Sequence, residues 1–177
     1  KKIEEAENMQ TLEDLYLPFK KKKNTKAETA RQNGLESLAK IIMAQRAEDL
    51  QFIASKYKNQ NVLSTEEALE GAGHIIAEWI NERSDIRNLM RWHLGKQGLI
   101  TAKAIPAKKM EEKAQTYKDY FEFSEAVQRC PSHRLLAMLR AEKEGFIRVK
   151  LELDDEKVNK KIEERIIKSN NACSGQI

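Results

Sequence analysis

The sequence predicts a mainly α-helical protein: a multi-helix, bundle-like domain with a small β element near residues 146–153. Only 7 glycines and 3 prolines occur in 177 residues, and Ala, Leu, Ile, Lys and Glu, which lose little side-chain freedom in a helix, dominate. Apolar residues recur at helical spacing along most of the chain. From Ile147 the period changes to strict alternation of apolar and charged residues, which is typical of a half-buried strand.

The first predicted helix carries an apolar stripe and ends before a proline. The stripe consists of Ile3, Ala6, Met9, Leu12 and Tyr16. Pro18 should end this helix and hold Leu17 in extended geometry, because its ring excludes continuation of the helix. We expect the cluster of apolar and aromatic residues from Leu15 to Phe19 to dock this helix onto the body of the domain. Four lysines then form a connector.

Two capping boxes predict the starts of later helices. In Thr25–Glu28 and in Ser64–Glu67 a hydroxyl and a carboxylate can satisfy the free amides of a first turn. Gly34 should end the first of these helices. Apolar stripes at Leu35–Ile42 and Leu50–Tyr57 predict two further helices. The helix after Ser64 should break at Gly71–Gly73 and resume through Ile80.

The second half of the chain mixes helices with extended segments. Ser84 should cap a helix that ends at Gly95, and Pro106 should open one that runs to about Tyr117. Pro131 should open another, with Leu135, Leu136 and Leu139 facing inward and Gly145 just past its end. The strand from Ile147 needs a partner, since a lone strand is unstable. Residues 98–105 are the best local candidate, and a last helix carries Val158, Ile162 and Ile166.

The composition excludes several classes of protein. No apolar run approaches the length of a membrane helix, and no signal peptide is visible. Cys130 and Cys173 lie far apart and match no metal spacing, so we expect a reduced, cytoplasmic compartment. The net charge of +4 permits contact with polyanions without requiring it. The start at Lys1, without Met, indicates a piece of a longer protein.

The sequence contains no recognisable set of catalytic or metal-binding residues, so it predicts neither an enzyme nor a cofactor. The three histidines lack the spacing of a helical metal site. His74 should lie near a helix start and His93 near a helix end, both in structural roles. Cys130 is near His133 in the sequence, but a nucleophile also needs an orienting group, and none is recognisable.

The run of lysines is the best functional candidate. Its basic residues are Lys20, Lys21, Lys22, Lys23, Lys26 and Arg31. Lysines neutralise phosphates and give salt-sensitive binding without base preference. The neighbouring aromatics Tyr16 and Phe19 could stack on bases. The alternative is a solvated connector, in which Tyr16 belongs to the first helix's apolar stripe and Phe19 pins a turn to the core.

A second candidate lies where the helix after Pro131 begins. Ser132, His133 and Arg134 crowd a helix N-terminus, whose backbone amides attract anions. The alternative is a purely structural role in capping and packing, which we prefer.

Three stretches resemble the bacterial Tex family of transcription accessory proteins. They are EDLYLPFKKKKNTKAETARQNGLE (Glu13–Glu36), ALEGAGHIIAEWI (Ala68–Ile80) and YKDYFEFSEAVQRCPSHRLLAMLRAEKEG (Tyr117–Gly145), in the family's order. The resemblance covers almost the whole chain. Lys21, Ala126 and Ala141 depart from the family pattern, where Pro, Pro and Gly are common, but no chemical group is lost.

The resemblance implies a fragment of a protein that works near RNA polymerase and its transcript. Proteins similar to Tex have an N-terminal helical part, a helix-turn-helix region, an RNase H-like domain, helix-hairpin-helix elements and an S1 domain that is associated with nucleic-acid binding. This chain resembles only the N-terminal and central parts, so no site is carried over from the S1 domain.

On this basis we expect three parts in residues 1–177. Residues 1–60 would be the N-terminal helical part, 61–145 a central region similar to a helix-turn-helix, and 146–177 a strand and helix leading to further domains. The expected function is a non-catalytic scaffold that associates weakly and non-specifically with RNA or DNA. The alternative is a helical module that docks RNA polymerase or other domains of the same protein, through the 98–105 face or the 146–153 edge.

Overall fold

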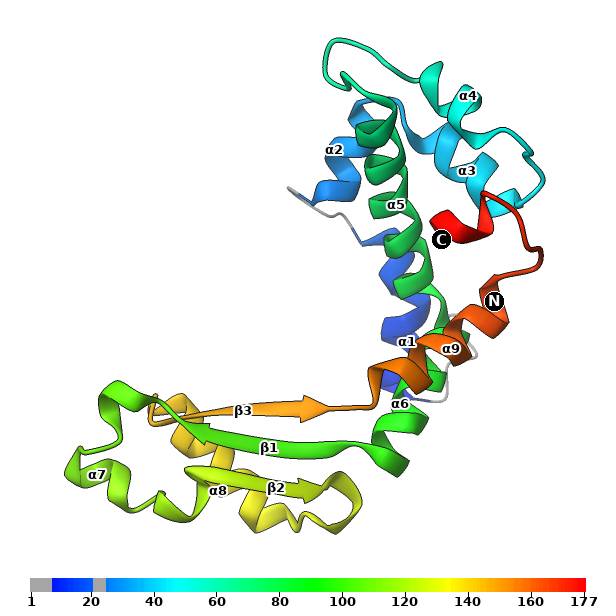
Figure 1. Ribbon diagram of the computed structural model, residues 1–177. Coiled ribbons are helices and arrows are strands. Elements are labelled where there is room, and N and C mark those ends of the chain that lie inside the picture. The colour runs from blue at the N-terminus through cyan, green and yellow to red at the C-terminus, as the bar shows by residue number, and fades with distance from the viewer. Residues whose placement is uncertain (1–7, 21–24) are drawn as a thin grey trace. The chain divides into compact units, whose positions relative to one another are not determined.

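The computed structural model of the chain describes residues 8–20 and 25–177 and is mainly α-helical, as predicted (Figure 1). The chain divides into two compact units. We call Lys1–Arg87 together with Lys161–Ile177 the helical unit, and Asn88–Lys160 the sheet unit. Helices α6 (Ser84–Gln97) and α9 (Asp155–Ile166) each contribute residues to both units.

The helical unit is built around one long helix. This helix is α5 (Thr65–Glu82), and the other elements are α1 (Met9–Tyr16), the 3-10 turn η1 (Leu17–Phe19), α2 (Lys26–Gln32), α3 (Glu36–Ala44), α4 (Leu50–Ser55) and the C-terminal 3-10 turn η5 (Ser174–Gln176). Helix α5 packs against α2, α3 and α4 (Figure 1). The largest side chains fully buried between them are Leu35, Leu38, Ile42, Ile75 and Ile76.

Both predicted capping boxes begin helices, and the predicted glycine ends one. The Thr25 hydroxyl accepts a hydrogen bond from the Glu28 amide at 3.1 Å, and Ser64 does the same for Glu67 at 3.1 Å. Gly34 follows α2 with φ +82°, a conformation that glycine adopts without steric cost.

The prediction that Leu17 is extended was wrong. Leu17 has helical dihedrals, φ −52° and ψ −42°, and the chain turns on through Pro18 as a 3-10 helix before Lys20 becomes extended. Proline is tolerated there because Pro18 occupies the first turn of η1, where a missing amide breaks no bond and its fixed φ fits.

The predicted break at Gly71–Gly73 does not exist, because α5 is continuous from Thr65 to Glu82. The two glycines have different surroundings. A Cβ added at Gly71 would lie 2.4 Å from Cδ1 of the buried Leu35, whereas one at Gly73 would meet nothing within 4 Å. Gly71 therefore allows the close approach of Leu35 to α5, and only Gly73 is free of packing constraint.

This difference predicts opposite effects of two substitutions in the same turn. Gly73→Ala should stabilise the helical unit by about 1 kcal/mol, since alanine is the better helix former by that amount. Gly71→Ala brings the same gain in helix propensity, but the new methyl group forces Leu35 to repack, which costs about 1–3 kcal/mol. The net effect of Gly71→Ala on the free energy of unfolding should therefore be neutral to destabilising. Urea denaturation followed by far-UV circular dichroism measures both, and equal effects of the two variants would contradict the packing role of Gly71.

The C-terminal segment is held to the helical unit by Gln45, which follows α3. The Gln45 side chain donates to the Ile166 carbonyl at 2.8 Å and accepts from the Lys168 amide at 2.7 Å. Its backbone carbonyl accepts from the side-chain amide of Asn171 at 2.8 Å. Cys173, which lies further along the same segment, is fully buried in the core of the helical unit. Residues 167–177 are therefore anchored to this unit and contribute Cys173 to its core.

The sheet unit contains three antiparallel strands in the order β2-β1-β3, namely β1 (Leu99–Ala104), β2 (Glu122–Ala126) and β3 (Ile147–Glu152). The predicted pairing of residues 98–105 with the strand from Ile147 is confirmed, with Thr101 opposite Lys150. Strand β2 was not predicted. Helix α8 (Ser132–Lys143) covers one face of the sheet and buries Met138 and Ala141 against it (Figure 1).

Three details of the second half of the chain differ from the sequence prediction. Leu135, Leu136 and Leu139 are exposed rather than inward, because α8 turns the stripe of Met138 and Ala141 to the sheet. Helix α6 passes Gly95 and ends at Gln97. The segment after Pro106 is not one helix but a 3-10 turn, Pro106–Lys108, the short helix α7 (Glu112–Gln115) and another 3-10 turn, Lys118–Tyr120.

Candidate nucleic-acid interface

Two aromatic rings are exposed just before the lysine run, Tyr16 at the end of α1 and Phe19 at the end of η1. The side chains of Tyr16 and Phe19 are 55% and 73% exposed. The expectation that they dock the first helix onto the core was wrong for these two residues, although Leu15 and Leu17 are half-buried. Lys20 follows directly and is exposed, while Lys21, Lys22 and Lys23 lie outside the described residues. The rings are accessible for stacking.

On the far side of the connector, Lys26 is exposed and is the first residue of α2. It borders a shallow hollow of about 260 Å³ whose rim also carries Glu67, Glu70 and His74. The carboxylates make this hollow itself unsuited to phosphate. Lys26 therefore belongs to the candidate interface through its position next to the lysine run, not through the hollow.

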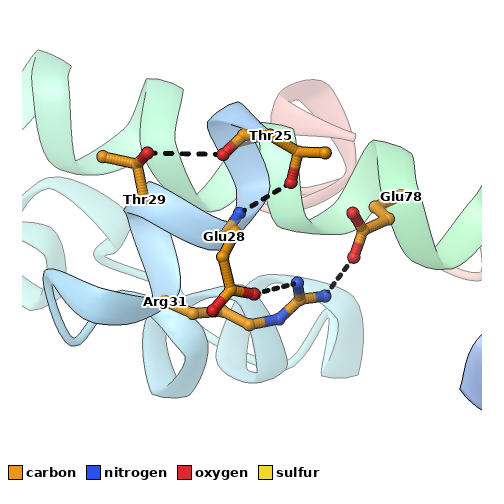
Figure 2. A network of polar contacts seen from close by, with 5 residues as sticks. All are labelled: Thr25, Glu28, Thr29, Arg31 and Glu78. Atoms are coloured by element: carbon orange, nitrogen blue, oxygen red, sulfur yellow. Dashed lines mark hydrogen bonds and ion pairs between the residues drawn. The ribbon is translucent and has the colours of Figure 1, made fainter. Parts of the chain in front are cut away.

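Arg31 is bonded to two carboxylates and is therefore not available to bind phosphate. Its guanidinium is bonded to Glu78 on α5 and to Glu28 on its own helix (Figure 2). The distance to the Glu28 carboxylate is 3.5 Å. Burial alone would lower the pKa of Arg31, but the hydrogen bond and attraction to Glu78 outweigh this and raise it. Thr25 and Thr29 complete the polar network around the start of α2 (Figure 2). Arg31 thus ties α2 to α5.

The second candidate cluster, Ser132, His133 and Arg134, lies in the first turn of α8. Ser132 and His133 are exposed, and no side chain caps this helix, whose N-cap is Pro131. Arg134 donates to Glu125 on β2 at 2.6 Å, which raises the pKa of the arginine. Only the side chains of Ser132 and His133 are therefore available at the helix start. Arg134, the one permanent cation of the three, is bound to Glu125 instead.

The remaining titratable groups form no site in the described ranges. No group of three His, Cys, Asp or Glu side chains among residues 8–20 and 25–177 could hold a metal ion. His74 lies within α5 rather than at a helix start, 3.5 Å from Glu70. Cys130 is a free thiol whose pKa is raised, mainly by burial and also by Glu125, so it is less nucleophilic than an ordinary cysteine.

The charge of the chain is unevenly divided between its units. The sheet unit holds 15 of the 32 Lys and Arg residues and 11 of the 28 Asp and Glu residues. Its net charge of +4 equals that of the whole chain, so the helical unit is neutral over its length. The four lysines of the run are thus a local basic feature of a unit whose other residues carry a net charge of −4. The excess in the sheet unit could not be recognised from the sequence, because the boundaries at 88 and 160 are visible only in the fold.

The family model described as "Tex central region-like" matches residues 45–176. This chain belongs to the Tex family. The match includes the sheet unit, α5 and the C-terminal segment, and the named Tex relatives extend it to most of the chain.

Several relatives are more than one-third identical to this Tex-family chain over the aligned residues. The transcriptional accessory protein Tex of Neisseria gonorrhoeae is 37% identical over 149 residues, which cover 84% of this chain and 19% of that protein. Protein tex of Bordetella pertussis is 39% identical over 154 residues, 86% of this chain and 19% of that protein. These relatives agree with the family model in placing the chain in the Tex family.

A more distant relative is the human S1 RNA-binding domain-containing protein 1, 30% identical over 158 residues, 85% of this chain and 16% of that protein. The chain spans between 16% and 25% of the length of the relatives it matches. None of the helices in the described ranges combines the length and the hydrophobicity needed to cross a bilayer.

Proposed function

We propose that this chain is a non-catalytic scaffold segment of a Tex-family transcription accessory protein, and that it contacts RNA or DNA through the connector between α1 and α2. The contact would be weak and independent of base sequence, and it would take place in the cytoplasm. The main nucleic-acid-binding domain of the full-length protein would lie outside this chain. The observation that carries the proposal is the exposure of Tyr16 and Phe19 next to the lysine run.

The physical argument combines stacking with charge. A water-exposed ring the size of Phe19 that contributes little to the core loses nothing when a base covers it, and base–aromatic stacking is worth about 1–3 kcal/mol per base. Lysines beside the ring neutralise phosphates and release counterions. Lys20 to Lys23 and Lys26 supply these charges, whereas Arg31 stabilises the fold through Glu78. Relatives whose names refer to transcription and to an S1 RNA-binding domain support this class of ligand.

The test is fluorescence anisotropy of a labelled single-stranded RNA and of duplex DNA, titrated with the wild type and with a variant in which Lys20 to Lys23 are alanine. We expect the variant to bind about tenfold or more weakly at low salt. Its plot of log affinity against log salt should be shallower by up to about 3, since each phosphate contact on a single strand contributes about 0.7 to the slope.

A matched control separates a local contact from a general effect of charge. Lys58, Lys96, Lys160 and Lys168 are exposed and form no ion pair with another described residue, so changing them to alanine removes the same charge elsewhere. This control should bind nearly as well as the wild type. Equal losses in both variants, or no binding by any of the three proteins, would make the run a solvated connector and turn the search to protein partners such as RNA polymerase.

A further inference from the structure

The sheet unit contains an apolar groove at the end of the sheet that α8 leaves open. The groove has a volume of about 270 Å³. It is lined by Ile100, Val127, Cys130, Leu135, Leu139, Val149 and Leu151. Leu139 and Leu151 are 45% and 56% exposed, so water reaches large apolar side chains on both walls. Apolar side chains grouped in this way mark interaction sites more often than scattered ones do.

The register of the sheet explains why the groove exists. Ile100 lies opposite Leu151, and Ala102 lies opposite Val149, so these four side chains share one face of the sheet. Helix α8 covers this face with Met138 and Ala141 in its second half. On another side of the same helix, Leu135 and Leu139, one turn apart, border the groove instead of filling it.

The edge of β3 is already partly occupied, which argues against an added strand. The amide of Val149 that faces away from β1 donates to the carboxylate of Glu142 at 2.8 Å. A strand pairing with β3 would have to displace this bond in the middle of the edge. A helix needs no backbone partner from the sheet, and Leu135 and Leu139 are one turn apart, the spacing at which helix ridges pack into grooves.

The rim of the groove next to Leu139 is basic. A second hollow, contiguous through Leu139, is lined by Leu136, Leu139, Arg140, Lys143 and Glu144. Arg140 and Lys143 are exposed, and their side chains form no hydrogen bond or ion pair with any residue that the structure describes. The sheet unit also carries the whole net charge of the chain. An occupant with acidic residues beside its apolar stripe complements this rim.

We propose that this groove binds an acidic amphipathic α-helix of a partner protein. Leucine-sized side chains one turn apart would insert between α8 and the Ile100–Leu151 end of the sheet, and carboxylates would meet Arg140 and Lys143. The groove lies in the sheet unit and the nucleic-acid contact in the helical unit, so either proposal can fail while the other stands.

The test uses a fluorescein-labelled synthetic peptide of about 20 residues, long enough to form a helix, with leucines at helical spacing and glutamates elsewhere. We expect saturable binding to the wild-type chain. The double variant Leu139→Gln/Leu151→Gln should bind about tenfold more weakly, since loss of a central apolar anchor commonly has an effect of this size. Arg140→Glu/Lys143→Glu should also weaken binding and should favour a lysine version of the peptide.

Leu99→Gln is the matched control, because Leu99 is 41% exposed in the same strand as Ile100 but on the opposite face of the sheet. It should bind the peptide as the wild type does, and circular dichroism melting identifies any variant that fails to fold. Equal binding of the acidic peptide by Leu139→Gln/Leu151→Gln would overturn the proposal. So would equal affinity for the glutamate and lysine peptides, or a dimer in sedimentation velocity that the leucine variant abolishes, since a second copy would then occupy the groove.

Discussion

Replacing Gln45 with alanine should lower the free energy of unfolding of the helical unit by about 2–4 kcal/mol. The substitution removes the donor to the Ile166 carbonyl and the acceptor for the Lys168 amide. Gln45 is buried, and so is Ile166. Each buried polar group left without a partner costs about 1–3 kcal/mol. The C-terminal segment would lose its main polar attachment to α3.

Two further variants separate the parts of this effect. Gln45→Glu keeps an acceptor for the Lys168 amide but cannot donate to Ile166, so it should also destabilise the unit. Gln45 has φ +53°, a left-handed conformation that costs an ordinary residue about 1–2 kcal/mol. Gln45→Gly should therefore be less harmful than Gln45→Ala.

Urea denaturation followed by tryptophan fluorescence measures these changes. Trp79 packs against the core of the helical unit, and Trp92 belongs to the sheet unit. A Trp92→Phe background therefore makes Trp79 the reporter. An unchanged denaturation midpoint for Gln45→Ala would show that the hydrogen bonds of Gln45 do not hold the C-terminal segment.

Replacing Arg87 with alanine should have the second large effect, about 3 kcal/mol. Arg87 Nε lies 2.6 Å from Oδ1 of Asp14, whose side chain is almost fully buried. Loss of a cation that close to a buried carboxylate is strongly destabilising, because the carboxylate stays out of water after this ion pair is lost. Asp14→Asn should be milder, since the side chain of Arg87 is about one-third exposed and can be hydrated.

The double variant Asp14→Asn/Arg87→Ala completes a thermodynamic cycle. We expect it to be less destabilised than the sum of the single variants, because the second change removes the charge that the first left behind. Additive effects in urea denaturation would mean that this ion pair does not link α1 to α6.

The parts of the fold that depend on local chemistry could be predicted from the sequence. Thr25 and Ser64 are good caps because their hydroxyls reach amides three residues on, and Gly34 adopts a left-handed conformation that other residues avoid. The alternation from Ile147 likewise needs no distant residue to be recognised as a strand. These features depend on neighbours within about one turn.

The errors come from residues whose role is set by distant contacts. Gly71 looks like a helix break, but its missing side chain makes room for Leu35, more than 30 residues away in the sequence. The periodicity of α8 offers two apolar stripes, and nothing local shows that Met138 and Ala141, rather than the leucines, meet the sheet. Strand β2 is short and charged at Glu122 and Glu125, so its pairing with β1 leaves little pattern.

The candidate interface was only partly predictable for the same reason. The lysine run is evident from the sequence, but the exposure of Tyr16 and Phe19 depends on what packs against α1 and η1. Arg31 belongs to the same basic stretch, yet Glu78, which lies 47 residues away, binds it. Charge in a sequence indicates which ligands are possible, and the fold decides which charges are free.

The most direct test of the proposed function compares two labelled single strands of equal length, one complete and one with abasic sites in place of its bases. Both carry the same phosphates, so only stacking distinguishes them. We predict that wild type binds the complete strand about tenfold more tightly, and that Tyr16→Ser/Phe19→Ser abolishes this difference while keeping the salt dependence of the lysines. Equal binding of both strands by the wild type, or an unchanged preference in the Tyr16→Ser/Phe19→Ser variant, would contradict the stacking of bases on Tyr16 and Phe19 that carries the proposal.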